Sequence, residues 1–200
     1  MTKNITKKKN IDYYTKLSEK YDNDVKSLNW GSRKSQELRF KILLEGGALN
    51  GKSILDIGCG FGDLYKYLKE KQYVGDYHGV DITPNMVQKA KQNHPKGNFE
   101  IKDIFIEHNK LCYDYILSSG IFYLIEGDQY KLMFDMIEKM FRIAKKGLAF
   151  NTLSSWSETL TKGEFYADPI KTISFCRGLT NNVVLRHDYH PSDFTIYLKK

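Results

Sequence analysis

The segment 53–64 constrains the fold of this chain most strongly, because a short apolar run leads directly into a turn rich in glycine. The apolar run at 54–57 predicts a strand covered on both faces, as in the middle of a parallel sheet. Gly58, Gly60 and Gly62 then leave out side chains where the backbone turns tightly and where the next helix packs close to the sheet. We therefore expect free backbone N–H groups and a helix N-terminus to face a nucleotide-like ligand.

Two acids follow at matching places on the next predicted strands. The run 77–81 predicts a second strand that ends in Asp81, placed to accept both hydroxyls of a ribose. The run 98–103 predicts a third strand that ends in Asp103. A nicotinamide dehydrogenase remains an alternative, but Asp63 stands where a pyrophosphate-binding turn needs glycine or alanine.

The rest of the chain alternates strand and helix patterns. Further strands are expected at 114–120, 148–152, 183–189 and 194–198, and helices at 83–92, 128–147 and 168–178. Thr83 and Asp128 are expected to cap their helices, and 145–147 to close the second one. Only 190–193 separate the last two strands, so these should pair as an antiparallel hairpin.

The run Asp56-Ile57-Gly58-Cys59-Gly60-Phe61-Gly62, with Asp81 and Asp103 behind it, resembles the class I S-adenosylmethionine-dependent methyltransferases. The resemblance covers residues 50 to 200 and implies a doubly wound α/β fold with helices on both faces of a mostly parallel sheet. It further implies the strand order 3-2-1-4-5-7-6, a C-terminal antiparallel hairpin and an N-terminal helical lid. In the family, the glycine turn cradles the methionine part of the cofactor, the second-strand acid holds the ribose and the third-strand acid takes the adenine amino group.

The expected cofactor-binding residues, carried over from the resemblance or from the predicted lid, are Tyr21, Arg39, Asp56, Gly58, Cys59, Gly60, Asp81, Ile82, Met86, Asp103, Ile104 and Ser119. Arg39 is expected to pair with the cofactor carboxylate, because a guanidinium binds carboxylates in a bidentate manner. By resemblance, Tyr21 would lie over the cofactor.

Several kinds of methyl acceptor are disfavoured by the predicted fourth and fifth strand ends. The segment 119–122 differs from the Asn/Asp-Pro-Pro-aromatic pattern of enzymes that methylate amino groups of adenine or glutamine, and Cys112 precedes the strand that would need a nucleophilic cysteine at its end. Only Asn151 offers a metal ligand there, so no metal is expected. These observations favour transfer to a nitrogen or oxygen of a small molecule, with S-adenosylhomocysteine as product.

Large side chains outside the central strands should enclose that acceptor. They are Tyr13, Tyr14, Trp30, Phe122, Tyr123, Trp156 and Tyr166. His187 and His190 are the candidate general bases, because the sixth strand should end on the ligand side of the sheet and a histidine accepts a proton near neutral pH.

The 200 residues fit one compact domain, divided into a basic flexible tail at 1–11, a helical lid at 12–50 and a cofactor-binding domain at 51–200. The net charge of +7 comes mainly from both chain ends, since four lysines in the tail and two at the C-terminus leave +1 for the body. A nucleic-acid partner is therefore disfavoured. An RNA methyltransferase and a non-catalytic cofactor-binding module remain alternatives.

The sequence has neither a membrane-length apolar run nor a signal peptide, so a soluble, cytoplasmic protein is expected. The three cysteines have no metal-ligand spacing and are expected to be reduced thiols. The oligomeric state is not indicated.

Overall fold

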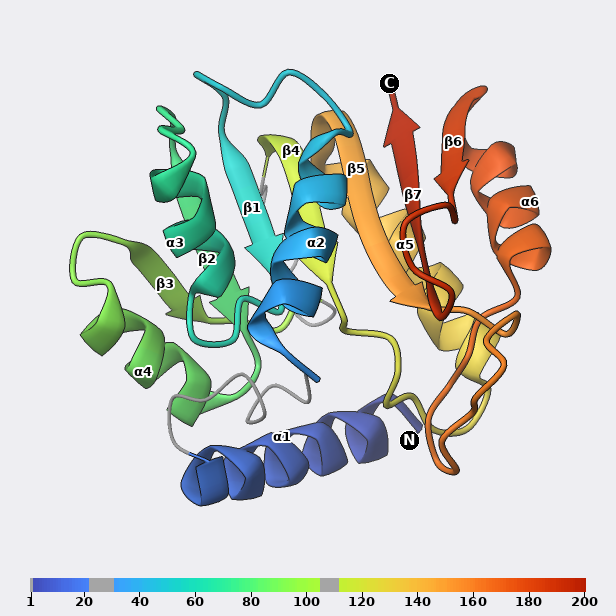
Figure 1. Ribbon diagram of the computed structural model, residues 1–200, viewed down its shortest axis with the longest axis horizontal. Coiled ribbons are helices and arrows are strands. Elements are labelled where there is room, and N and C mark those ends of the chain that lie inside the picture. Colours follow the sequence, from blue (N-terminus) through green and yellow to red (C-terminus); the bar gives the residue numbers. More distant parts are fainter. Residues whose placement is uncertain (1, 22–30, 105–111) are drawn as a thin grey trace.

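A computed structural model describes residues 2–21, 31–104 and 112–200, with side chains from residue 7 onward. The described strands are β1 Ile54–Ile57, β2 Tyr77–Asp81, β3 Asn98–Ile101, β4 Tyr113–Ser119, β5 Ala144–Leu153, β6 Asn182–Arg186 and β7 Asp193–Lys199. They form one seven-stranded sheet with the order β3-β2-β1-β4-β5-β7-β6 (Figure 1). The first five strands pair in parallel, and β7 is antiparallel to both β5 and β6. The expected fold class, strand order and hairpin are confirmed.

The described helices are α1 Thr2–Tyr21, α2 Arg33–Leu44, α3 Asp63–Glu70, α4 Pro84–Asn93, α5 Gln129–Ile143 and α6 Pro169–Leu179. Buried side chains of α2, α3 and α4 form one core against the sheet, and those of α5 and α6 form a second core with the central and C-terminal strands. The sheet is therefore covered on both faces, which explains why all four residues of its interior strand β1 are buried and three of them are apolar.

Helix α1 lies across the edge of the sheet to which β1 and β5 point (Figure 1). It packs against α4, where Lys89 Nζ donates a hydrogen bond of 3.1 Å to the Ser18 carbonyl oxygen. A flexible tail was expected at 1–11. In the structure, residues 2–11 are instead the first half of α1. No glycine or proline interrupts residues 2–21, so nothing local ends the helix between the tail and the lid.

Some predicted boundaries were wrong because strand pairing overrides local signals. The residues 145–147, expected to close the helix before them, belong to β5, since Ala144 and Gly147 already pair with β4. Strand β6 ends at Arg186, so 187–192 form the connection to β7. Thr83 occupies the N-cap of α4, but its side chain does not cap the helix.

Within the described residues, none of the helices has the length and hydropathy needed to cross a membrane.

Candidate functional site

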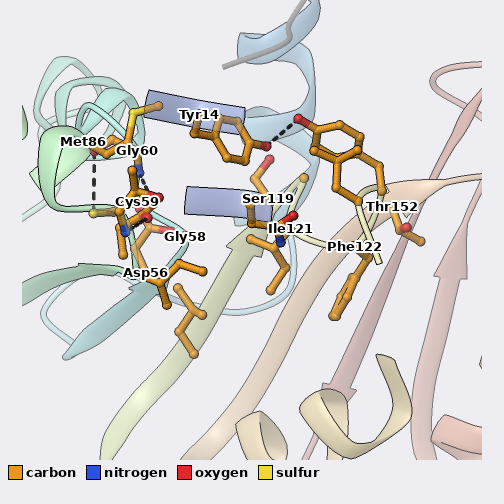
Figure 2. A pocket seen from close by; sticks show the side chains of 18 of the residues that line it. Tyr14, Asp56, Gly58, Cys59, Gly60, Met86, Ser119, Ile121, Phe122 and Thr152 are labelled. Carbon is orange, nitrogen blue, oxygen red and sulfur yellow. Dashed lines mark hydrogen bonds between the residues drawn. The ribbon is translucent and has the colours of Figure 1, made fainter. Parts of the chain in front are cut away.

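One cavity of about 460 Å³ opens at the carboxyl edge of the parallel strands. Its lining comes from α1, α2, the turn after β1, the ends of β2 and β4, the segment before α5, and the end of β5. Figure 2 shows this pocket running from the glycine turn and Met86 at one end to Phe122 and Thr152 at the other. Ligands of open α/β sheets bind at this edge, so the cavity is the candidate site.

The glycine turn is tied to β2 by its own backbone. Gly58 and Cys59 both donate to the carbonyl oxygen of Val80, at 2.8 and 3.1 Å, and the Gly60 N–H donates to Asp81 Oδ2 at 3.1 Å. This corrects the expectation that the N–H groups of the turn are free for a ligand. They are bonded within the protein, which fixes the turn beside Asp81 before any ligand binds.

Gly58 is required by the geometry of the turn. Its φ is +81°, a left-handed conformation that side chains disfavour. A Cβ atom placed there would lie 2.3 Å from Cγ2 of Ile121, which is one of the pocket-lining residues. Any larger residue would therefore strain the turn and collide with the opposite side of the pocket.

A buried and a half-buried carboxyl group, those of Asp56 and Asp81, lie next to this turn. Asp56 is 2% exposed and accepts a hydrogen bond of 2.6 Å from the Tyr77 hydroxyl. Burial raises the pKa of Asp56 to about 7. Burial also raises the pKa of Asp81, against the effect of the backbone N–H donors of Gly60 and Thr83, the latter at 2.9 Å. Both oxygens of Asp81 thus already accept one hydrogen bond and keep lone pairs for a ligand.

Asp103, two residues after the end of β3, also lines the cavity. Lys7 of α1 forms an ion pair of 2.9 Å with Asp103 Oδ2 and itself lines the pocket, as does Asn10. Sequence reasoning missed Lys7 and Asn10 because it assigned them to a tail. The uninterrupted helical segment was the signal that could have identified them.

Tyr14 of α1, labelled in Figure 2, and Tyr123 after β4 both line the pocket. Their hydroxyl oxygens are 2.5 Å apart, and the rings pack edge to face with centroids 6.4 Å apart. Burial raises the pKa of both hydroxyls. Both remain protonated near neutral pH, so the pair acts as a neutral contact between α1 and the body.

Helix α2 contributes an ion pair and an amide to the same cavity. Arg39 is 5% exposed and pairs with Asp193 at the start of β7, while its guanidinium also donates to the Ser35 carbonyl oxygen at 2.8 Å. Gln36 is 1% exposed, and its amide nitrogen donates to Asp63 Oδ2 at 3.1 Å. The Gln36 carbonyl oxygen has no hydrogen-bond partner among the described residues. Sequence reasoning missed this acceptor because nothing local distinguishes Gln36 from other residues on a helix.

The cavity brings together most of the residues expected to bind the cofactor. Those that line it are Arg39, Asp56, Gly58, Cys59, Gly60, Asp81, Ile82, Met86, Asp103, Ile104 and Ser119. Tyr21, although described, is not among the lining residues. Arg39 is engaged by Asp193, which gives the guanidinium an internal carboxylate partner in place of the expected cofactor carboxylate.

The expected acceptor residues divide in the same way. Tyr14, Phe122 and Tyr123 line the cavity, whereas the described residues Tyr13, Trp156 and Tyr166 do not. Tyr13 packs on the edge of Tyr14, Trp156 is 53% exposed, and the Tyr166 hydroxyl donates to Glu164 at 2.8 Å. Trp30 lies outside the described residues.

The two candidate general bases are held outside the described lining of the cavity. His187 Nε2 forms a hydrogen bond of 2.6 Å with Ser154 Oγ, and its ring packs against Trp156. His190 Nδ1 lies 3.0 Å from Asp193 Oδ2, and burial lowers the pKa of this histidine. The longer connection after β6 carries both rings away from the strand end at which they were expected.

Comparison with known proteins identifies the family. The chain belongs to the family described as a methyltransferase domain, whose profile matches residues 49–183. A Mycobacterium tuberculosis protein named as a methyltransferase, Rv1506c, is 30% identical over 155 residues, which cover 74% of this chain and 93% of that protein.

Solved structures show the same fold. The N-methyltransferase NodS from Bradyrhizobium japonicum WM9, in complex with S-adenosylhomocysteine, has a TM-score of 0.67 at 18% identity, covering 94% of this chain and 97% of that one. Magnesium protoporphyrin IX methyltransferase from Synechocystis PCC 6803, with bound S-adenosylhomocysteine, has a TM-score of 0.67 at 14% identity, covering 96% and 94%. The predicted family and enzyme class, an S-adenosylmethionine-dependent methyltransferase, are confirmed.

Proposed function

We propose that this enzyme transfers a methyl group from S-adenosylmethionine to a nitrogen or oxygen of a small molecule by direct displacement. The observation that carries the proposal is the continuity of the cavity. A single pocket is lined by Gly58, Gly60, Asp81, Phe122 and Tyr123. Gly58 and Gly60 lie toward one end of it and Phe122 toward the other (Figure 2). A cofactor and an acceptor can therefore bind next to each other in this one pocket.

The residues at the glycine-turn end fit the cofactor. Asp81 would accept the ribose hydroxyls, and Asp103 the adenine amino group, between the apolar side chains of Ile82, Met86 and Ile104. When bound, S-adenosylmethionine supplies a methyl group made electrophilic by its sulfonium sulfur.

The buried carbonyl oxygen of Gln36 fits the cofactor ammonium, because it lacks a donor and lies beside the carboxylate of Asp63. Gln36 would thus bind the amino-acid end of the cofactor by accepting a hydrogen bond from its ammonium group. The sequence had instead led us to expect that Arg39 binds the carboxylate of that end. The carboxylate of Asp63 and the amide oxygen of Gln36 would both face the positive ammonium group.

The other residues of the pocket would align the acceptor and exclude water. Direct displacement needs the acceptor atom in line with the methyl group in a site with little water. The hydrogen-bonded pair of Tyr14, on α1, and Tyr123 would cover the pocket on the α1 side. The acceptor loses a proton on methylation, and His187 and His190 stay predictions for this step.

Calorimetric titration tests the proposal. S-adenosylhomocysteine should bind, and NAD should not, because the turn has Asp63 where a pyrophosphate needs close approach. Binding of NAD alone would refute the proposal. Methyl transfer to a mixture of small amines and phenols, followed by mass spectrometry, would separate an enzyme from a non-catalytic binding module.

The RNA alternative gains no support from α1. Lys7 and Lys9, two of the lysines that gave the chain end its charge, form ion pairs with Asp103 and Glu126. Tight RNA binding in about 0.15 M salt, where exposed charges are largely screened, would favour the RNA alternative over a small acceptor.

We further propose that α1 acts as the lid. It contributes Lys7, Asn10 and Tyr14 to the lining and is joined to the body by polar contacts that a ligand could strengthen. Amide hydrogen exchange of residues 7–21 should slow when S-adenosylhomocysteine is added. Equal exchange with and without ligand would mean that α1 is fixed structure.

A further inference from the structure

The pocket has an apolar end that the cofactor residues do not account for. Its lining there is Phe122, Ile125, Leu132, Met136, Leu153 and Thr152. Leu132 and Met136 are four residues apart on α5, so they lie on one stripe of the helix. The neighbouring stripe, with Met133 and Ile137, is fully buried against the sheet. Helix α5 thus presents a separate apolar stripe to the pocket.

Thr152 is the polar exception in this apolar end. It is 2% exposed, and its hydroxyl oxygen has no hydrogen-bond partner among the described residues. Along β5 it lies on the same face as Phe150, whose ring packs edge to face on Phe122 at 5.6 Å. Buried hydroxyl groups are nearly always hydrogen-bonded, so an unpaired one in a pocket wall suggests a ligand partner.

The neighbouring charges restrict that ligand. The cations in the described lining are Lys7, Arg39 and Lys102, which form ion pairs with Asp103, Asp193 and Glu100. Glu164 also lines the pocket and accepts a hydrogen bond of 2.8 Å from the Tyr166 hydroxyl. An acceptor with a carboxylate or phosphate would meet carboxylates here, with each lining cation already matched by an acid.

We propose that this end of the pocket binds the methyl acceptor. The acceptor is an uncharged, largely apolar molecule about the size of one aromatic ring, and its hydroxyl or carbonyl group hydrogen-bonds to Thr152. The proposal rests on the proposed function and specifies its substrate class. A rotation of roughly 120° about the Cα–Cβ bond of Thr152 moves the hydroxyl into the position of the methyl group and the methyl group into that of the hydrogen, so the side chain can present the hydroxyl to a ligand.

Fluorine NMR with three probes of similar shape tests this in the protein saturated with S-adenosylhomocysteine. The probes are 4-fluorophenol, 4-fluorotoluene and 4-fluorobenzoate. In Thr152→Val, which keeps the shape and removes the hydroxyl, 4-fluorophenol should bind about tenfold more weakly, while 4-fluorotoluene should change little. Thr152→Ser should retain the affinity for 4-fluorophenol, and 4-fluorobenzoate should bind most weakly throughout.

A position control comes from Leu132→Trp, which fills the apolar end and should weaken both uncharged probes. Unchanged binding of 4-fluorophenol to Thr152→Val, or tightest binding of 4-fluorobenzoate, would overturn the inference. Failure of either uncharged probe to bind would overturn it as well. Failure of S-adenosylhomocysteine to bind the unaltered protein would instead refute the proposed function, so the two failures can be told apart.

Discussion

Substitution of Asp81 is the sharpest test of the cofactor site, because this residue has one structural role in the protein and one proposed role in ligand binding. It holds the glycine turn through the Gly60 N–H and the start of α4 through the Thr83 N–H, and we propose that it also accepts the ribose hydroxyls. Hydrogen bonds to a charged group contribute about 1.5–3 kcal/mol each. Asp81→Ala should therefore weaken S-adenosylhomocysteine binding at least about 10- to 150-fold in calorimetric titration, which corresponds to the loss of one such bond.

A loosened turn could weaken binding without any ribose contact, so the ligand must be varied together with the protein. Adenosine and 2′,3′-dideoxyadenosine differ only in the ribose hydroxyls. Unaltered protein should prefer adenosine about 10- to 150-fold, and Asp81→Ala should lose most of that preference. If both proteins discriminate the two ligands equally, Asp81 has only the structural duty. Thermal melting of the variant without ligand reports the loss of the turn contacts separately.

Three further predictions concern stability, each measured by urea unfolding. Burial raises the pKa of Asp56 to about 7, so between pH 5 and pH 7 the folded state holds a proton on Asp56 that the unfolded state has lost. The free energy of unfolding should therefore fall by about 2.5 kcal/mol between pH 5 and pH 7.5. An equal pH dependence in Asp56→Asn would contradict this. Tyr14→Phe should cost about 1–3 kcal/mol because it leaves the Tyr123 hydroxyl unpaired, and the double Phe variant should cost less than the sum of the single changes; strict additivity would refute the coupling. Arg39→Met should cost about 3–5 kcal/mol by leaving buried Asp193 without its guanidinium partner, and adding Asp193→Asn should recover part of that loss. No recovery would argue against the ion pair.

The parts of the site that the sequence predicted are those with a local cause. Gly58 is needed because one backbone angle is left-handed, and Asp81 ends a strand whose apolar pattern is visible in five residues. Parallel strands place their carboxyl ends at one edge, so these residues meet whatever the rest of the chain does. Asp103, Met86 and Ser119 were expected near the cofactor from the family resemblance, and all three line the same cavity.

The predictions that this geometry does not support concern residues whose partners are distant in the sequence. Arg39 looks like a ligand-binding cation, but its carboxylate partner Asp193 comes 154 residues later, at the start of β7. His187 lies near the expected strand end, yet Ser154 and the shortened β6 hold its ring outside the cavity.

By itself, the sequence determined the class of fold, the order in which strands and helices follow and the glycine turn that lines the cavity, because hydrophobic periodicity and glycine conformation act over a few residues. Only the tertiary structure decided which side chains enclose the pocket. Lys7, Gln36, Leu132 and Thr152 each lie on an ordinary helix or strand and gain their role from what packs opposite them. Such pairings depend on the relative placement of whole elements, which no short pattern in the chain encodes.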